Sequence, residues 1–334
     1  MVERLHPHAA ARDGTEPKAR SVALQENPDA LLAARQALLA SGAHLHGPDI
    51  AERLGVPEAA IFAARVGQDA IELVADLVTL LAPLAEWSKV LIATRSPFGA
   101  ALCLGRFAPP TAADGRLCLE NAEHRIEVAT ASVDRIYLLR EADKMHGQSL
   151  SLNAFDAAGD ALLRVYLLSK DGRDMAASHF TLFGLCPFTR RWRPRTDKPT
   201  AAQAARVLAA PDSAARAGHL LARAVLALPE RPDGTLTIAT PTAQLRTRAE
   251  TRSSEHISPV VHATGHGLKL HLRPAAAATM QHIDRQGLRT LCFLAENGDR
   301  LEFGPSSAEA QPAFDQWLAN LTQSDGGAAP DGSV

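Results

Sequence analysis

The sequence has neither an excess of one charge nor closely spaced cysteines. Its 35 basic and 37 acidic residues give a formal net charge of −2, which excludes a global field that would attract nucleic acid or an anionic membrane surface. The four cysteines, Cys103, Cys118, Cys186 and Cys292, stand far apart and form no CxxC pair, so they do not indicate a structural zinc site. We interpret them as buried thiols in a reducing compartment.

The sequence also lacks a long apolar run and the short motifs of common enzymes. Its longest apolar stretch, residues 70–87, is interrupted by Glu72, Asp76 and Glu86, and charged side chains are costly at the centre of a bilayer. Residues 1–21 have no apolar segment of the kind found in a secretory signal. The motifs GxSxG, HExxH, GxxxxGKS/T and GxGxxG after a strand are absent. We therefore expect a cytoplasmic chain without a membrane span, and nothing indicates an enzyme with its own organic cofactor.

Two regions of the chain alternate apolar and polar residues as antiparallel strands do. The first begins at Lys89 and the second at Gly234, and Gly, Pro and Asp interrupt both at turn positions. Helical patterns precede the first region, fill the Ala-rich segment between the two, and close the chain in residues 307–321. We expect a disordered segment at 1–25, a first repeat at 26–184, an inter-repeat segment with helices at 185–232, a second repeat at 233–322 and a disordered tail at 323–334.

The two strand regions are similar to each other. Gly159-Asp160 and Gly298-Asp299 occupy the same turn between alternating strands, and such residues tolerate the positive φ of a tight hairpin. HRIEVA, from His124, matches HGLKLH, from His266. The alternation predicts a meander of antiparallel strands in each region. The sequence therefore predicts an α+β fold with two tandem structural repeats, each a largely antiparallel β-sheet flanked by helices.

Residues 48–67 have the outline of a helix-turn-helix, with Gly55 in the turn and Pro57 at the start of the second helix. Base readout would need basic or amide side chains early on that helix, whereas Glu58, Ile61 and Phe62 stand there. We interpret the unit as a helical cap that packs on the first repeat, and we do not expect nucleic acid as a partner.

Several segments, in their order and spacing, resemble the HemS-type hemin transport and hemin-degrading proteins. The segments that carry the resemblance are DIAERLGVPEAAIFAARVG, LCLENAEHRIEVATASVDRIYLL, LSLNAFDAAGDALLRVYLLSKDGRDMAA and LCFLAENGDRLEFG. The resemblance implies two sheets flanked by helices, haem held in a cleft between module surfaces, and delivery of haem to a haem oxygenase. A haem ABC transporter is a further partner that it implies, and some members of the family are proposed to break the haem ring themselves.

Three positions depart from the pattern that the family implies. The family's iron ligand is a histidine in a segment of the form W-R-x-x-T-D-x-H, and the corresponding residue here is Pro199, which cannot ligate iron. The family's distal arginine corresponds to Glu127, although Arg125 lies on the same strand face. Residues 303–305 replace an aromatic-Gly-Gln element with Phe-Gly-Pro. Haem carriage, haem degradation and a scaffold without haem all stay open, and carriage is favoured over catalysis because nothing in the sequence supplies a redox centre.

Histidines are the first candidates to replace Pro199, because neutral imidazole is the usual protein ligand of haem iron. We predict His266 as an iron ligand, since it lies between two glycines where a planar ligand can approach the backbone. His219, on a predicted helix, is the second candidate, and His124 is the third because its place matches that of His266. Each could instead be an ordinary surface histidine, which is how we interpret His271.

A basic run in the inter-repeat segment is a candidate for holding the haem propionates. Arg193 and Arg195 can pair with carboxylates in a bidentate fork, and Trp192 can lie on a porphyrin face. Arg125 is the candidate for this role in the first repeat. The basic run is equally typical of a solvated linker, and its single aromatic residue is weak support for binding single-stranded nucleic acid.

Overall fold

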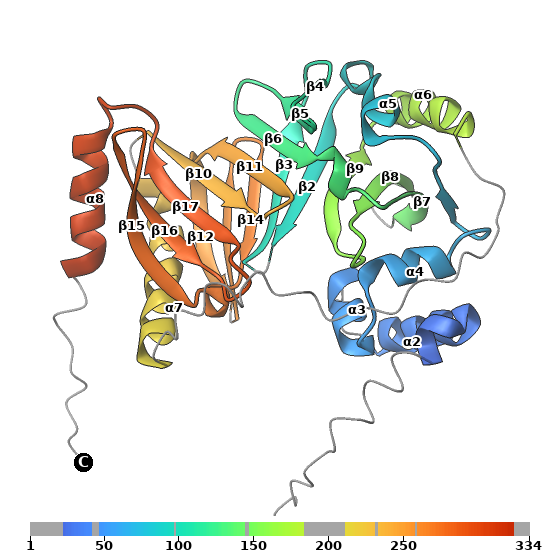
Figure 1. The fold of residues 1–334 in the computed structure, drawn as a ribbon, viewed down its shortest axis with the longest axis horizontal. Coiled ribbons are helices and arrows are strands. Elements are labelled where there is room, and N and C mark those ends of the chain that lie inside the picture. The colour runs from blue at the N-terminus through green and yellow to red at the C-terminus, as the bar shows by residue number, and fades with distance from the viewer. Residues whose placement is uncertain are drawn as a thin grey trace, which may run out of the picture.

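Two antiparallel sheets form the centre of the molecule in the computed structural model (Figure 1), which describes residues 23–41, 47–96, 98–143, 147–183, 211–230, 233–257 and 259–323. Sheet I has nine strands in the order β1-β7-β8-β9-β2-β3-β14-β13-β12. Sheet II has eight strands in the order β15-β16-β17-β10-β11-β6-β5-β4. The strands of the first half of the chain are β1 (Ala70–Glu72), β2 (Val90–Ser96), β3 (Gly99–Gly105), β4 (Thr111–Ala113), β5 (Arg116–Glu120), β6 (His124–Ala129), β7 (Arg135–Asp143), β8 (Gly147–Phe155) and β9 (Ala161–Leu167). The strands of the second half are β10 (Gly234–Ala239), β11 (Ala243–Arg248), β12 (Thr251–Ile257), β13 (Val260–Gly265), β14 (Leu268–Leu272), β15 (Thr279–Arg285), β16 (Leu288–Leu294) and β17 (Arg300–Pro305).

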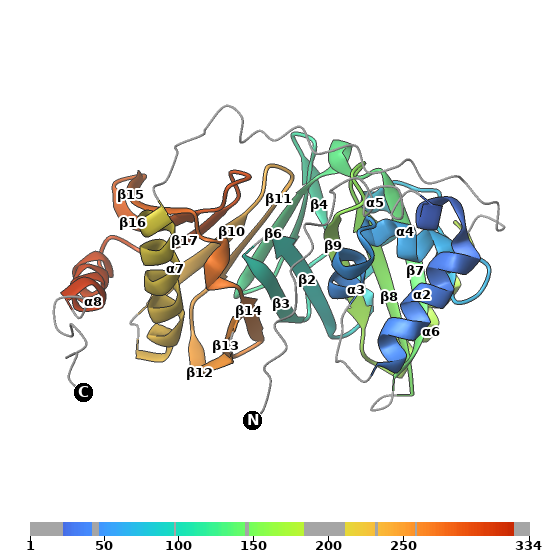
Figure 2. The ribbon, with the colours of Figure 1, turned by 90° about the horizontal axis from the view of Figure 1, so that it is seen from below.

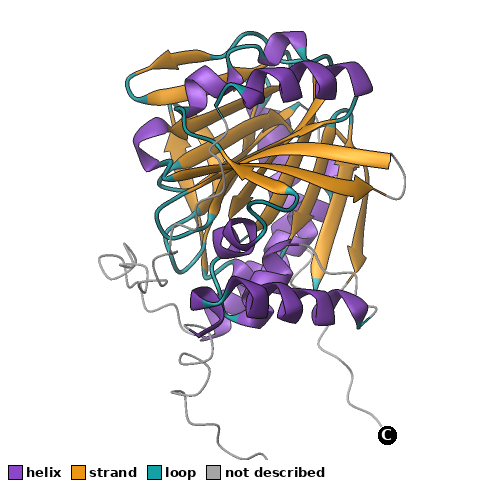
Figure 3. Cartoon of the chain, turned by 90° about the vertical axis from the view of Figure 1, so that its right-hand side faces the viewer, coloured by secondary structure: helices purple, strands orange, loops and turns teal. Residues whose placement is uncertain are grey.

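Helices flank the two sheets, and Figure 3 shows them on both sides of the stacked strands. The helices are α2 (Pro28–Ala40), α3 (Gly47–Leu54), α4 (Glu58–Ala64), α5 (Leu77–Leu81), α6 (Lys170–Thr181), α7 (Pro211–Leu226) and α8 (Gln311–Gln323), and the 3-10 turn η5 (Pro274–Ala276) follows β14. No helix within the described ranges is long and apolar enough to cross a membrane.

The same strand order occurs in both sheets, built once by each half of the chain. In sheet I, β7-β8-β9-β2-β3 of the first half continues into β14-β13-β12 of the second half. In sheet II, β15-β16-β17-β10-β11 of the second half continues into β6-β5-β4 of the first half. The predicted α+β fold with two tandem repeats is confirmed, and each half contributes a three-stranded unit to the sheet of the other.

This exchange of strands differs from the simple meander that the alternating pattern predicts. β4, β5 and β6 do not pair with β3, which precedes them, because β6 pairs with β11 of the second half. An alternation with a period of two residues indicates that a strand has one buried face, and it carries no information about which strand lies beside it. The exchange therefore comes from tertiary packing.

The strand pairing corrects the predicted match between His124 and His266. β6 begins at His124 and pairs with β11, whereas β14 begins at Leu268 and pairs in the same way with β3. Leu268 is thus the structural equivalent of His124, and His266 lies in the turn before β14. A shift of two residues preserves the alternation of inward and outward side chains, so the pattern could not detect it. The matched turns at Gly159 and Gly298 are confirmed, since both glycines have a positive φ between equivalent strands.

The helices α2, α3 and α4 form a cap on the outer face of sheet I (Figure 2). Residues 59–62 of α4 are buried, and the ring of Phe62 lies 4.9 Å from that of Phe155 and 6.0 Å from that of Tyr137. Leu31 of α2 and Ile50 of α3 belong to the same hydrophobic cluster. The start of α4 thus faces the sheet, as expected for a packing unit and not for a base-reading helix.

A continuous hydrophobic core joins the inner faces of the two sheets. It includes Ile92 and Cys103 of sheet I together with Ile126 and Leu245 of sheet II. The apolar sides of α7 and α8 extend this core at the end of the molecule opposite the cap (Figure 1). Because both sheets contain strands of both halves, the core cannot be divided into one part for each repeat.

The described cysteines are thiols, and two of them are buried. Burial raises the pKa of Cys103 to about 12 and that of Cys292 to about 11. Cys118, on the outer face of β5, is only half-buried, which differs from the expectation, and Cys186 lies outside the described residues.

Candidate functional site

The turns that precede β6 and β14 meet where the two sheets join. Glu123 directly precedes β6, which begins at His124, and His266 and Gly267 form the turn before β14. The backbone N–H of Leu104 in β3 donates to the Gly267 carbonyl over 2.7 Å. The fold thus places two of the predicted histidines, His124 and His266, beside one carboxylate, that of Glu123.

His266 is held through one ring nitrogen by a carboxylate. Its Nδ1–H donates to Oε1 of Glu123 over 2.9 Å, and its side chain is 68 % exposed. A carboxylate cannot donate, so this bond fixes the proton on Nδ1 and leaves the Nε2 lone pair available. Gly267 needs to be glycine here, since its φ is +67° and a Cβ would lie 2.7 Å from the Leu104 carbonyl oxygen.

His124 is a buried part of the junction. Its Nδ1 lies 2.7 Å from Oγ1 of Thr247 in β11, and its ring stacks against Phe107 with centroids 6.5 Å apart. Burial lowers the pKa of His124, although the neighbouring Glu123 opposes this effect. The alternative of a solvent-exposed turn histidine is wrong for this residue, which is 2 % exposed. Iron could reach its nitrogens only if the junction opened.

His219 lies in a different part of the molecule from His266. It is on the exposed side of α7, whose opposite side packs into the core. The preceding Gly218 lies against the Pro274 carbonyl of η5, where a Cβ would be 3.0 Å from the oxygen. Since η5 follows β14 and His266 precedes it, the two predicted iron ligands lie toward opposite ends of that strand.

Arg125 projects from the outer face of sheet II among other charged groups. It donates to Glu127 over 2.8 Å and to Glu120 over 3.0 Å. Arg116 lies 3.4 Å from the Glu127 carboxylate, and the exposed Arg246 of β11 stands directly opposite Arg125. Glu127, at the position of the expected distal arginine, is thus surrounded by guanidinium groups on this face.

The basic run of the inter-repeat segment and the position of the expected axial histidine lie outside the described residues, which do not include Trp192, Arg193, Arg195 or Pro199. Their proposed contacts with haem stay a prediction.

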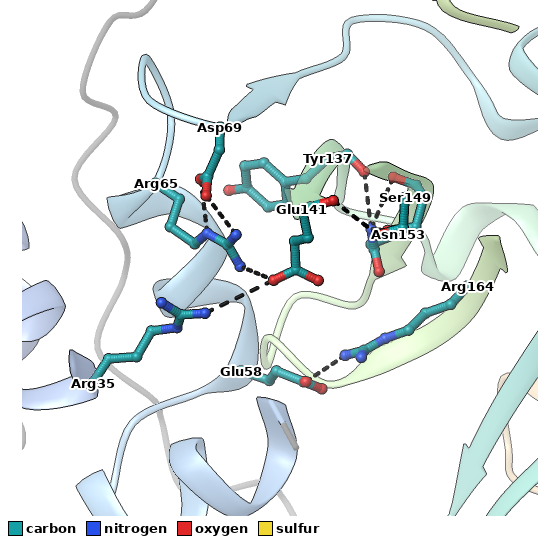
Figure 4. Close-up of polar contacts among 10 residues, drawn as sticks. Arg35, Glu58, Arg65, Asp69, Tyr137, Glu141, Ser149, Asn153 and Arg164 are labelled. Atoms are coloured by element: carbon teal, nitrogen blue, oxygen red, sulfur yellow. Dashed lines mark hydrogen bonds and ion pairs between the residues drawn. The ribbon is translucent and has the colours of Figure 1, made fainter. Parts of the chain in front are cut away.

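The sequence did not predict the charged groups between the cap and sheet I. Glu58 of α4 and Arg164 of β9 form a buried ion pair, and Figure 4 shows them pointing toward each other. Nearby, Arg65 bonds Asp69 over 2.6 Å and Glu141 over 2.8 Å (Figure 4). No sequence signal could have found these pairs, because each depends on how the cap sits on the sheet.

The contact between two histidines of sheet I was also not predicted, although both lie in a histidine-rich segment of the sequence. His271 of β14 lies on the outer face of its strand, as interpreted, and there it is half-buried and bonds His262 of β13. No group of three His, Cys, Asp or Glu side chains converges as a metal site in the part of the chain that the structure describes.

Comparisons with known proteins find the same fold in solved structures. Residues 55–180 match the family model of the haemin-degrading HemS.ChuX domain, and a comparison with curated proteins finds no match. The heme degrading enzyme ChuS of Escherichia coli O157:H7 is 14 % identical with a TM-score of 0.72, over 90 % of this chain and 99 % of ChuS. Holo-PhuS, a heme-binding protein from Pseudomonas aeruginosa, is 16 % identical with a TM-score of 0.72, over 89 % of this chain and 98 % of PhuS. Residues 55–180 are therefore similar to the HemS.ChuX domain, and over most of its length the chain has the fold of ChuS and PhuS.

Proposed function

We propose that this protein binds haem and carries it toward haem utilisation. The HemS.ChuX domain and the shared fold support the ligand class, since ChuS and PhuS are described as heme-degrading and heme-binding proteins. They do not identify the ligating residues, because the position expected for the axial histidine is Pro199.

The observation that carries the proposal is the bond between Glu123 and His266. Histidines that bind metals usually donate their other ring N–H to a carboxylate or carbonyl, which orients the ring and raises its basicity as a ligand. Glu123 does this for His266 through Nδ1, and the His266 side chain is 68 % exposed. We therefore propose His266 as the iron ligand.

The outer face of sheet II offers partners for the propionates on β6, the strand that directly follows Glu123. Arg125 and Glu127 are two residues apart in β6, so their side chains leave the same side of the strand. Arg246 stands opposite Arg125 and forms no ion pair with a described carboxylate. A guanidinium pairs with a carboxylate through two parallel hydrogen bonds, so we propose Arg125 and Arg246 as propionate partners.

A titration of the full chain with ferric haem tests the proposal. We expect a saturable Soret shift that ends at one equivalent, weaker binding in His266→Ala, and an altered spectrum in Glu123→Gln because the ring loses its carboxylate partner. His282→Ala, an exposed histidine of β15, is the matched control. A wild-type spectrum like that of haem with a nonspecific protein would refute haem binding, and an unchanged His266→Ala spectrum would refute the ligand.

The double variant Pro199→His, His266→Ala tests whether a histidine at the position expected from the family can bind haem iron. Recovery of the Soret shift would show that only the ligand has moved. No recovery would show that a histidine at position 199 cannot replace His266.

Haem degradation is the second candidate, because ChuS is described as a heme degrading enzyme. Addition of a reductant and oxygen to the haem complex separates the two functions. A carrier keeps its Soret band, apart from the change on reduction, whereas an enzyme loses it and yields a bilin-like product.

A further inference from the structure

A pair of histidines faces outward where β13 and β14 run side by side in sheet I. His262 and His271 are directly opposite each other in the antiparallel register. Their Nδ1 atoms are 2.6 Å apart, and their rings are nearly perpendicular, with centroids separated by 4.7 Å. Both side chains are half-buried. The two imidazoles thus direct one nitrogen each at the same point.

The backbone holds this pair in place from both sides. The residues that flank the two histidines point inward and are buried in the core: Val261, Ala263, Leu270 and Leu272. On the other side of β14, the start of β3 comes so close that a Cβ on Gly99 would lie 1.9 Å from the His271 carbonyl oxygen. The pair therefore belongs to the rigid sheet and not to a loop, which favours a preorganised site.

The chemistry of the pair suits a divalent transition ion. Imidazole nitrogen is a good ligand for zinc, nickel and copper, with bonds of about 2.0 to 2.1 Å to zinc. At a tetrahedral angle two such bonds place the nitrogens about 3.3 Å apart, so small side-chain rotations from 2.6 Å are sufficient. One ring passes its proton from Nδ1 to Nε2, both Nδ1 lone pairs then face the ion, and the neutral pair releases no proton.

A carboxylate stands in the same row of the sheet. Glu255 of β12 is opposite His262 in the register, and its side chain is exposed. Facing side chains on adjacent strands are about 4.5 to 5.5 Å apart at Cβ, so the Glu255 carboxylate can turn toward the ion as a third ligand. Water would occupy the remaining positions.

We propose that His262 and His271 form a chelating site for a divalent ion of the zinc, nickel and copper class, with Glu255 as an additional ligand. The site is separate from the proposed haem site, whose arginines project from sheet II. The equivalent positions on sheet II hold Cys118 and Glu127, which are also directly opposite each other. The histidine pair is therefore a property of one sheet only.

Zinc titration of the full chain, followed by calorimetry at pH 7.5, tests the proposal. The wild type should show a stoichiometric site, and His262→Ala and His271→Ala should each lose it, with at least a tenfold loss of affinity. The double variant should lose no more than either single variant, because a chelate needs both rings. His282→Ala should match the wild type, so that weak binding by the other histidines is subtracted.

Cu²⁺ EPR gives a second readout that does not depend on affinity. We expect superhyperfine coupling to two nitrogens in the wild type and to one in His262→Gln, which is chosen in case the alanine variant is less stable. Equal zinc isotherms for the wild type and His271→Ala, or a copper spectrum that His262→Gln leaves unchanged, would overturn the proposal. Neither experiment contains haem, so its failure is distinct from failure of the haem proposal.

Discussion

The outer faces of sheets I and II have the same strand order and carry different side chains. In sheet I, Arg164 of β9 is opposite Ala93 of β2, and in sheet II the equivalent Glu302 of β17 is opposite Thr237 of β10. Arg164 is buried under the cap with Glu58 of α4, whereas Glu302 receives a 2.6 Å hydrogen bond from the half-exposed Arg285 of its own sheet. The buried charge has the opposite sign in the two repeats, although the strand topology is the same.

The difference shows which part of a duplicated sheet is free to change. The inner faces share one hydrophobic core, and a change there would be felt by both repeats. The outer faces touch different neighbours, so each can acquire its own groups. The outer face of sheet I carries the cap and the histidine pair, and that of sheet II carries the arginines that we propose as partners of the haem propionates.

Removal of Glu58 should have the largest effect on stability. Glu58→Ala leaves Arg164 buried without its carboxylate, and loss of one partner of a buried pair costs about 3 to 5 kcal/mol. Urea unfolding measures this loss, and Glu302→Ala should cost less, about 1.5 to 3 kcal/mol, because its guanidinium partner is half-exposed. Glu58→Leu combined with Arg164→Met should recover stability. Equal losses in the two single variants would contradict the contrast between the faces.

Gly99→Ala should have the next largest effect. Gly99 begins β3 opposite Leu272, and the equivalent residue of β11 is Ala243, which shows that sheet II accepts a Cβ at this place. In sheet I the φ of Gly99 is +129° and the Cβ would meet the His271 carbonyl, so we expect a loss of about 2 to 4 kcal/mol.

Gly115→Ala is the control for Gly99→Ala, measured by the same unfolding experiment. Its φ is +71° and nothing lies within 4 Å of its Cβ, so only the backbone conformation is strained, at about 1 kcal/mol. If both variants lost the same stability, the close approach of β3 and β14 would not constrain the fold.

The junction of the sheets should make stability depend on pH through His124. Burial holds its pKa below the ordinary value, so the unfolded chain binds more protons below about pH 6.5 and the stability from this residue is lost as the pH falls toward 5. His124→Asn should reduce the slope of the unfolding free energy between pH 7 and pH 5. The exposed His282→Ala should leave the slope unchanged, and a slope insensitive to His124→Asn would show that the buried ring does not carry the effect.

The sequence could predict the strands and the repeat, and it could not predict most of the contacts that make the sites. Alternation and the turns at Gly159 and Gly298 follow from local chemistry. The bond between Glu123 and His266 joins residues 143 positions apart, and only the exchange of strands brings them together. His262 and His271 are a different case, because a hairpin centred on His266 and Gly267 would have placed them opposite each other.

Arg125→Ala should have the smallest effect on the free energy of unfolding and should clearly lower the affinity for haem. Its ion pairs are half-exposed, and such pairs contribute about 0.2 to 1 kcal/mol, while haem affinity in the Soret titration should fall several-fold with the loss of a propionate partner. Lys269 occupies the equivalent place in β14, second in its strand and exposed, so Lys269→Ala is the matched control on sheet I. If it weakened haem binding as much as Arg125→Ala, the two outer faces would not differ in function, and haem would have to be assigned to both or to sheet I.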